Sequence, residues 1–288
     1  MTSIRTYLSS HKKIKSLLQP FAGSYFSLTG KFHLLPNYLI IGAAKSGTSS
    51  LYEYLIQHPN VGAASGKEIY FFDMNYEKGI NWYRTFFPLS KTSNNLTSFL
   101  VGEATPRYLD HPHAPQRIKK HIPNTKLIVL LRNPIDRAYS HWNMMVNHDR
   151  ENLSFEDAID NEEQRTEGLL EKMEKSNSFY SKEYYWYSYL ERGLYAKKLK
   201  NWFKLFPKEQ FLILKSEKLF SEPADVFKQT QNFLNIPEIT LDKFQTARKG
   251  EYKKKSLDSK IRKRLSEYFE PHNQELYSLI GENFAWEE

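Results

Sequence analysis

The sequence predicts an α/β protein built on a doubly wound parallel sheet with helices on both faces. Residues 38–41 and 126–131 are continuously apolar rather than alternating, as strands buried on both faces are. Each run is followed at once by a loop and then a helix-type pattern, which is the order of a βα unit. In sheets of this class the ligand lies at the carboxyl ends of the strands.

The chain of 288 residues suits one large domain, since a chain this long can bury most of its surface without dividing. We predict this domain over residues 36–288, after a basic helical extension of residues 1–35 that contains Lys12, Lys13 and Lys15. No apolar segment approaches the roughly 20 residues that cross a bilayer or resembles a signal sequence. We therefore expect a cytoplasmic protein, with peripheral membrane contact through the basic extension left open.

The net charge of +8 and the pI near 9.2 favour an anionic partner, because a positive surface concentrates acidic ligands. A nucleotide, an acidic polysaccharide and a membrane surface all qualify, and we expect no specific nucleic-acid partner. The absence of cysteine excludes disulfides and thiolate metal ligands. His111 and His113 lack a second ligand cluster with zinc-like spacing, so we predict no metal site.

The stretch after the first strand is the strongest functional signal. Gly42 and two alanines leave little side-chain bulk, and Leu51, Tyr54 and Leu55 then mark one face of a helix that stops at Pro59. Between them stand an ammonium group, a glycine and several hydroxyls, in the order Lys45, Ser46, Gly47, Thr48, Ser49 and Ser50. Together with the free N–H groups at a helix start, they predict a phosphate-binding loop.

This loop differs from the nucleoside-triphosphate P-loop. That motif places its lysine directly after the second glycine, whereas Lys45 precedes Gly47 here. The second strand also ends on Arg132 instead of a magnesium-binding aspartate. Asn133 is predicted to cap the next helix, which Pro134 begins and which carries Ser140 in its first two turns. An arginine beside a hydroxyl predicts a phosphate clamp.

The rest of the chain predicts further strands and helices in alternation. We expect strands at 61–64, 99–103 and 211–214 and a compact apolar run at 68–72. We expect helices at 79–87 and 223–234, exposed helices with solvated charges within 152–178, and a helix over 256–280 that breaks or kinks near Pro271. Residues 180–206 are rich in aromatics. Packing is the default interpretation for these, and lining of an acceptor cleft is the alternative.

These motifs, with Gly79-Ile80-Asn81-Trp82-Tyr83 and the terminal Phe284-Ala285-Trp286, give the chain a family resemblance over residues 36–286. The chain resembles sulfotransferases that use 3′-phosphoadenosine-5′-phosphosulfate (PAPS), in the bacterial type of the heparan-sulfate N-/3-O-sulfotransferase branch. The resemblance implies a P-loop-kinase-like fold. It also implies PAPS as cosubstrate, adenosine 3′,5′-bisphosphate as product, and no metal.

The resemblance also implies site residues. The cosubstrate would be bound by the loop from Lys45 to Ser50, by Arg132 and Ser140, and by a later loop with Lys249, Gly250 and Tyr252. The acceptor, a sugar or another hydroxyl- or amine-bearing molecule, would contact Glu68, Phe71, Phe72, Asp73, Ala104, Thr105 and Arg107. Related enzymes commonly carry a lysine where this chain has Ala104, and Lys67 or Arg107 could supply that charge.

The catalytic residues expected from the resemblance are Lys45, facing the departing phosphate oxygen, and Glu68 as the base. Glu68 stands beside Ile69, Tyr70, Phe71 and Phe72, and apolar surroundings raise the pKa of a carboxyl group towards the range of a general base. Glu103 and His141 are the alternative bases. Two other functions stay open at this stage: a noncatalytic module that binds an acidic polymer through the basic run 248–264, and a nucleotide kinase.

Overall fold

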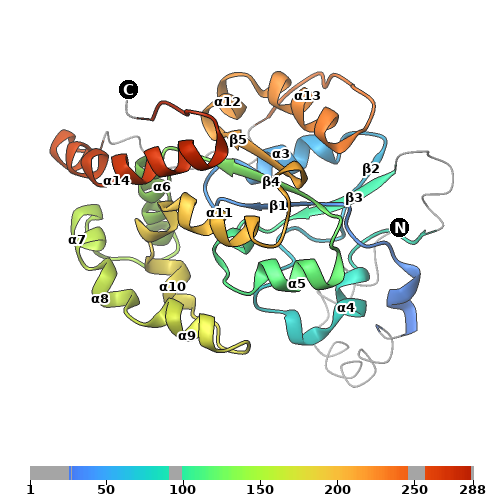
Figure 1. Cartoon of the computed structure of the whole chain (residues 1–288), viewed down its shortest axis with the longest axis horizontal. Coiled ribbons are helices and arrows are strands. Elements are labelled where there is room, and N and C mark those ends of the chain that lie inside the picture. The colour runs from blue at the N-terminus through green and yellow to red at the C-terminus, as the bar shows by residue number, and fades with distance from the viewer. Residues whose placement is uncertain (1–25, 27, 91–98, 246–256, 287–288) are drawn as a thin grey trace.

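The computed structural model describes residue 26 and residues 28–90, 99–245 and 257–286. Its centre is a five-stranded parallel sheet in the order β2-β3-β1-β4-β5 (Figure 1). The strands are β1 Tyr38–Gly42, β2 Val61–Gly62, β3 Leu100–Ala104, β4 Lys126–Leu131 and β5 Phe211–Lys215. The predicted doubly wound parallel sheet is confirmed. Chain order reverses around β1, which pairs with β3 on one side and β4 on the other.

Both faces of the sheet are covered, because successive residues of a strand point to opposite faces. Leu39 and Ile41 pack in one apolar cluster with α5 (Ala114–His121), α11 (Tyr195–Phe203) and α14 (Ser259–Ile280). Tyr38 and Ile40 pack in the other, with α3 (Thr48–Leu55) and α13 (Pro223–Leu234). All five residues of β1 are buried, as expected for the central strand of such a sheet.

The pairing of β1 with β3 depends on a glycine. Tyr38 is opposite Gly102 in the register, and a Cβ at Gly102 would lie 2.5 Å from the Tyr38 ring. The ring therefore lies directly over the neighbouring backbone, which only glycine allows. Substitution of Gly102 would push apart the two strands whose carboxyl ends border the site.

A further group of helices lies beyond one side of the sheet (Figure 1). It comprises α6 (Pro134–Asn147), α7 (Phe155–Asp160), α8 (Glu162–Thr166), α9 (Leu169–Lys175) and α10 (Lys182–Tyr187). The prediction that charges in this region are solvated fails for Glu162, which is 6% exposed. Its carboxylate accepts the backbone N–H groups of Leu190 and Glu191, at 2.6 and 2.9 Å, and so it fixes the turn after α10.

Some predicted boundaries are wrong. The helix expected over 79–87 is only α4 (Ile80–Arg84), after a 3₁₀ turn at Tyr76–Lys78. No break occurs at Pro271, since α14 continues through it. Pro271 has no N–H to donate, so the carbonyl oxygen of Glu267 lacks its helical hydrogen-bond partner. Glu267 is exposed, and water can supply the missing hydrogen bond. The remaining short elements are α12 (Ser216–Ser221) and 3₁₀ turns at Gly30–Phe32, Tyr108–Asp110, Glu191–Gly193 and Lys208–Gln210.

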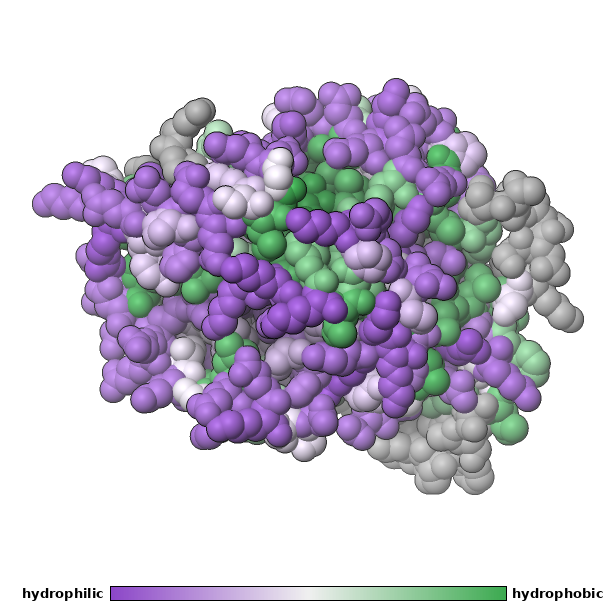
Figure 2. Space-filling view, in the orientation of Figure 1, coloured by the Kyte–Doolittle hydropathy of each residue, from purple (hydrophilic) through white to green (hydrophobic). Residues whose placement is uncertain are grey.

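The face seen in Figure 2 is mostly hydrophilic, with apolar side chains showing between α11 and the α12–α13 pair. Within the described ranges, no helix combines the length and apolar character needed to cross a membrane. Most of the predicted basic extension, residues 1–35, lies outside the described residues.

Candidate active site

The loop between β1 and α3 forms one wall of a cavity of about 840 Å³ at the carboxyl ends of the central strands. Lys45 and Gly47 have positive φ angles of 73° and 86°, which turn the chain tightly before the helix begins. Gly47 is the N-cap of α3, and a Cβ there would lie 2.9 Å from Leu219. The loop is therefore packed closely against α12.

The loop residues differ in what they present to the cavity. Lys45, Gly47, Thr48, Ser49 and Ser50 line it, together with Ala44. The start of α3 adds unpaired backbone N–H groups and the positive end of the helix dipole. Ser46 is not a lining residue. Its side chain is fully buried, and its carbonyl oxygen accepts a 2.7 Å hydrogen bond from Ser216.

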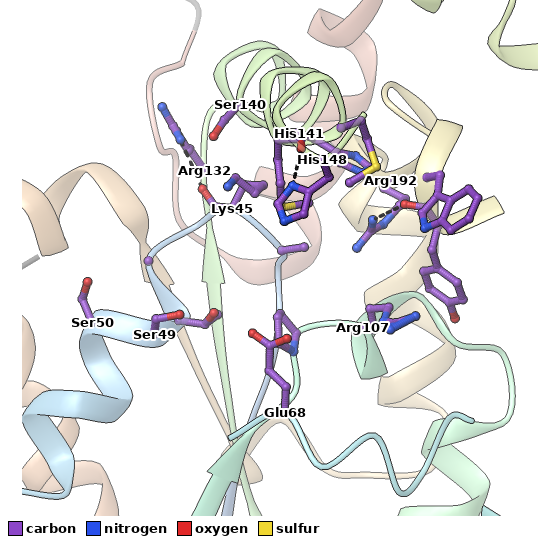
Figure 3. A pocket seen from close by; sticks show the side chains of 18 of the residues that line it. Lys45, Ser49, Ser50, Glu68, Arg107, Arg132, Ser140, His141, His148 and Arg192 are labelled. Carbon is purple, nitrogen blue, oxygen red and sulfur yellow. Dashed lines mark hydrogen bonds between the residues drawn. The ribbon is translucent and has the colours of Figure 1, made fainter. Parts of the chain in front are cut away.

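Arg132 and Ser140 lie beside this loop, as predicted for a clamp (Figure 3). The Arg132 guanidinium donates to the Lys45 carbonyl oxygen at 3.2 Å, and the Arg132 carbonyl accepts from Tyr195 at 2.8 Å. Asn133 caps α6 by accepting the Ile135 N–H at 3.0 Å, which confirms the predicted cap. The turn from β4 into α6 thus holds an arginine and a hydroxyl on the wall next to the loop.

Glu68 lies at the base of the cavity (Figure 3). The Tyr70 hydroxyl donates a hydrogen bond to its Oε2, and the Lys67 ammonium lies 3.7 Å from its Oε1. The side chain is 24% exposed. Lys67 also donates to the Ser49 hydroxyl, so one lysine connects the carboxylate to the phosphate-binding loop.

The expectation of apolar surroundings for Glu68 is wrong. Ile69, Phe71 and Phe72 are buried in the core, whereas Glu68 turns towards a lysine and a tyrosine hydroxyl. Positive φ angles at Glu68 (57°) and Tyr70 (56°) break the regular alternation of the run. The short segment consequently sends its apolar and polar side chains in different directions.

Glu103, an alternative base, is 1% exposed and does not line the cavity. Its carboxylate accepts hydrogen bonds from the hydroxyls of Tyr83 and Tyr108, both at 2.8 Å, and of Thr105 at 2.6 Å. Burial raises the pKa of Glu103, which these hydroxyl donors partly offset. Its geometry is that of a carboxylate satisfied inside the core.

Several predicted acceptor contacts must be corrected. Phe71, Phe72, Ala104 and Thr105 have no exposed surface and do not line the cavity. Phe71 instead stacks on Tyr83 with ring centres 4.5 Å apart. Residues at the end of a buried strand, or packed beneath its loop, fill the interior although they belong to recognisable motifs.

Asp73 and Arg107 form a pair, but only the arginine lines the cavity. The Arg107 Nε lies 3.8 Å from Asp73 Oδ2, with 22% of the arginine side chain and none of the aspartate exposed. Burial raises the pKa of Asp73 to about 6, against the opposing effect of Arg107. Asp73 therefore holds Arg107 rather than contacting an acceptor.

The rest of the wall comes from the following part of α6, from α10 and from the turn after α10. The aromatic lining considered for residues 180–206 is present in Tyr185 and Trp186. Residues that the sequence analysis missed are Tyr70, Pro106, Met144, Met145, His148, Arg150, Arg192 and Phe220. Residues 144, 145 and 148 lie three, four and seven positions after His141, on the same face of α6, so the helical period could have indicated them.

The cavity lining is strongly basic. Lys45, Arg107, Arg132, Arg150 and Arg192 contribute to it, and Glu68 is the acid among the described lining residues. Residues Lys249, Gly250 and Tyr252 lie outside the described residues. In the part of the chain that the structure describes, no group of three potential metal ligands comes together.

Comparison with known proteins connects this arrangement to one family. A model of the sulfotransferase domain matches residues 35–278. Human heparan sulfate glucosamine 3-O-sulfotransferase 3B1 is 32% identical over 286 residues, covering 92% of this chain and 68% of that protein. The human bifunctional heparan sulfate N-deacetylase/N-sulfotransferase 3 is 32% identical over 276 residues, covering 85% of this chain and 30% of that protein.

A solved structure agrees with these similarities. A sulfotransferase from Alicyclobacillus acidocaldarius is 28% identical, with a TM-score of 0.67, over 88% of this chain and all of that chain. Residues 35–278, which the sulfotransferase-domain model matches, contain the β1–α3 loop, the Arg132 turn and the cavity between them. The chain therefore belongs to the PAPS-dependent sulfotransferase family and is a sulfotransferase.

Proposed function

We propose that this enzyme transfers a sulfonate group from PAPS to a hydroxyl or amine of a carbohydrate acceptor, with Glu68 as the general base. The supporting observation is that one cavity of about 840 Å³ joins the β1–α3 loop, the Arg132–Ser140 pair and Glu68. That volume is at the upper end of the size of ligand pockets. It suits two substrates bound side by side.

The chain's own groups fit the donor. The α3 N-terminus with Thr48, Ser49 and Ser50 suits the 5′-phosphate, and Arg132 with Ser140 suits the 3′-phosphate. PAPS, when bound, supplies an activated sulfonate on a phosphate leaving group. Lys45 lines the cavity at the start of the loop, where its charge would stabilise negative charge on the oxygen that leaves.

Glu68 is the acid on the cavity surface in a position to take a proton from the acceptor. Tyr70 and Lys67 fix its carboxylate from two sides, and a fixed base loses little entropy in reaching the reacting hydroxyl. Through Ser49, Lys67 also relates the position of the base to the donor loop. Exposure to the cavity favours Glu68 over Glu103, which is buried in the core and does not line the cavity.

We further propose a glucosamine-containing acidic polysaccharide as the acceptor class, since several relatives are named for heparan sulfate glucosamine. The five basic side chains of the cavity lining support this. Ala104 is buried in the apolar cluster that contains α3. The positive charge that a lysine supplies at this position in related enzymes must therefore come from another residue. Arg107, which lines the cavity nearby, is the candidate.

Two assays test the function. In the first, thermal unfolding is measured with adenosine 3′,5′-bisphosphate, with ATP and Mg²⁺, and with heparin. Stabilisation by the bisphosphate is expected, whereas stabilisation by ATP and Mg²⁺ alone would indicate a kinase, and by heparin alone a binding module. In the second, PAPS with a labelled sulfonate is incubated with N-sulfated, N-acetylated and de-N-acetylated heparan chains. Labelling of none of them would contradict the proposed acceptor class.

A further inference from the structure

Three buried side chains from α6, α10 and the turn after α10 have polar atoms without a hydrogen-bond partner among the described residues. These atoms are both ring nitrogens of His141, the Tyr185 hydroxyl and Nη2 of Arg192. The residues are 0%, 4% and 3% exposed, and all three line the cavity. A buried polar atom without a hydrogen-bond partner is destabilising, so four such atoms together indicate a ligand that supplies the missing partners.

Arg192 is held in place by the groups behind it. Its Nε donates to Asp110 Oδ2 at 2.8 Å. Its Nη1 donates to the Tyr185 carbonyl oxygen at 3.3 Å, the dashed contact of Arg192 in Figure 3. Two of its three nitrogens are thereby engaged, and Nη2 is the one left over. A guanidinium fixed in this manner is preorganised to bind an oxyanion.

Two cations lie near the Tyr185 ring. The guanidinium carbons of Arg107 and Arg192 are 4.9 and 5.5 Å from the centre of its ring, within the range of cation–π attraction. Burial raises the pKa of the Tyr185 hydroxyl well above its usual value. The hydroxyl therefore keeps its proton and can donate a hydrogen bond to a ligand.

His141 adds a neutral donor. Burial, followed by the charges of Arg192, Arg137 and Lys45, lowers its pKa well below the usual value. A neutral imidazole has one N–H donor and one acceptor. The Tyr185 carbonyl raises this pKa slightly, but neither ring nitrogen makes a hydrogen bond of good geometry within the described chain.

The position of these residues indicates which substrate they serve. In Figure 3, Arg192 and Arg107 lie across the cavity from Ser49, Ser50 and Arg132, with Glu68 between the two sides. We propose that His141, Tyr185 and Arg192 form a subsite for an anionic oxygen group of the acceptor, a carboxylate or a sulfate ester close to the reacting hydroxyl. This assignment rests on the proposed function, and it makes the three residues determinants of acceptor specificity.

Calorimetric titration tests the subsite on the full chain saturated with adenosine 3′,5′-bisphosphate. The titrants are tetrasaccharides from heparin, with sulfate and carboxylate, from unsulfated chondroitin, with carboxylate only, and from chitin, without charge. The charged sugars should bind at least tenfold more tightly than the neutral one, and the heparin–chondroitin pair separates sulfate from carboxylate. Tyr185→Phe and His141→Phe should each weaken binding of the charged sugars about 2- to 12-fold.

Stability supplies a second readout. Tyr185→Phe and His141→Phe remove polar atoms that have no partner, so the melting temperature of the free protein should stay constant or rise. Tyr268→Phe is the matched control, since Tyr268 is an exposed residue of α14 outside the cavity lining. Arg192→Ala is less informative because it would leave the buried Asp110 carboxylate without this donor.

Three results would overturn the assignment. Unchanged affinity of both variants for the charged sugars would show that the unpaired atoms serve no acceptor. Equal wild-type affinity for charged and neutral sugars would exclude an anionic subsite. Loss of adenosine 3′,5′-bisphosphate affinity in the variants would mean that these residues bind the donor nucleotide instead of the acceptor. Failure of the wild-type protein to bind the bisphosphate would instead contradict the proposed function on which the subsite rests.

Discussion

The hydroxyl of Tyr70 donates a hydrogen bond to Glu68, two residues earlier in the chain. The same tyrosine ring has the Arg107 guanidinium 4.4 Å from its centre, and Asp73 holds that guanidinium from behind. The carboxylate at the base of the cavity is therefore the first of four linked groups. The orientation of each depends on the next one.

Glu68→Gln should lower kcat by roughly 10²- to 10⁴-fold, because the amide keeps the shape of the side chain but cannot take a proton. Binding of adenosine 3′,5′-bisphosphate should survive. The measurement is steady-state turnover with labelled PAPS, alongside calorimetry with the bisphosphate. Glu53→Gln, an exposed substitution on α3 outside the cavity lining, is the control. Near-normal turnover of a folded Glu68→Gln enzyme would remove Glu68 from the role of base.

Arg132→Ala should reduce affinity for adenosine 3′,5′-bisphosphate by about 2 kcal/mol, or roughly 30-fold, through the loss of a charge-assisted contact. Affinity for adenosine 5′-monophosphate, which lacks the 3′-phosphate, should change little. Ser140→Ala should show a smaller loss of the same kind. Arg264→Ala removes an exposed guanidinium paired with Asp160 and serves as control. Equal losses for both nucleotides would mean that Arg132 acts by supporting the Lys45 carbonyl.

Glu103→Gln should lower the free energy of unfolding by about 1–3 kcal/mol, because an amide NH₂ would face hydroxyl donors in the core. Turnover of the folded fraction should change far less than in Glu68→Gln. Urea unfolding and turnover at low temperature separate the two effects. Abolished turnover with unchanged stability would transfer the catalytic role to Glu103.

Glu162 should make stability depend on pH. Burial raises its pKa in the folded protein to about 7, from 4.5 for the free group. The folded state then binds the proton more tightly than the unfolded state, so the stabilisation is complete below pH 4.5 and is lost as the pH rises towards 7. The shift corresponds to up to roughly 3 kcal/mol.

Urea unfolding of wild type and Glu162→Gln at pH 4.5, 6 and 7.5 measures this effect as a difference between the two proteins. The free energy of unfolding of Glu162→Gln, relative to that of the wild type, should increase as the pH rises. Glu163→Gln, at the exposed neighbouring position, should follow the wild type. Parallel curves for wild type and Glu162→Gln would show that Glu162 titrates alike in both states.

Sequence patterns were sufficient for the sheet and for the side of the cavity formed by the β1–α3 loop and Arg132. Continuous apolar runs predicted β1 and β4, and the loop from Lys45 to Ser50 is a local motif whose function depends on neighbours in sequence. Asn133 was predictable as a cap for the same reason. Local patterns of this kind report backbone geometry directly.

The other side of the cavity could not be predicted in the same manner. It includes Arg150, Tyr185 and Arg192, which come from separate segments and meet only through tertiary packing. The error for Phe71 and Phe72 has a related cause, since a motif of mixed polarity does not say which of its residues face the interior. Positive φ angles at Glu68 and Tyr70 changed the direction of the side chains there.

The turn that carries Arg132 depends on residues made much later in the chain. The Asn133 side chain donates to the Trp286 carbonyl oxygen at 3.2 Å, and the Trp286 indole donates to Glu217, whose carboxylate also accepts the Asn133 N–H. During translation, β4 leaves the ribosome long before Trp286 is made, so the turn that carries Arg132 should acquire its final rigidity only once Trp286 is in place. Nascent chains stalled before residue 284 should therefore bind adenosine 3′,5′-bisphosphate poorly although their sheet has formed, and vectorial synthesis itself would delay the onset of activity.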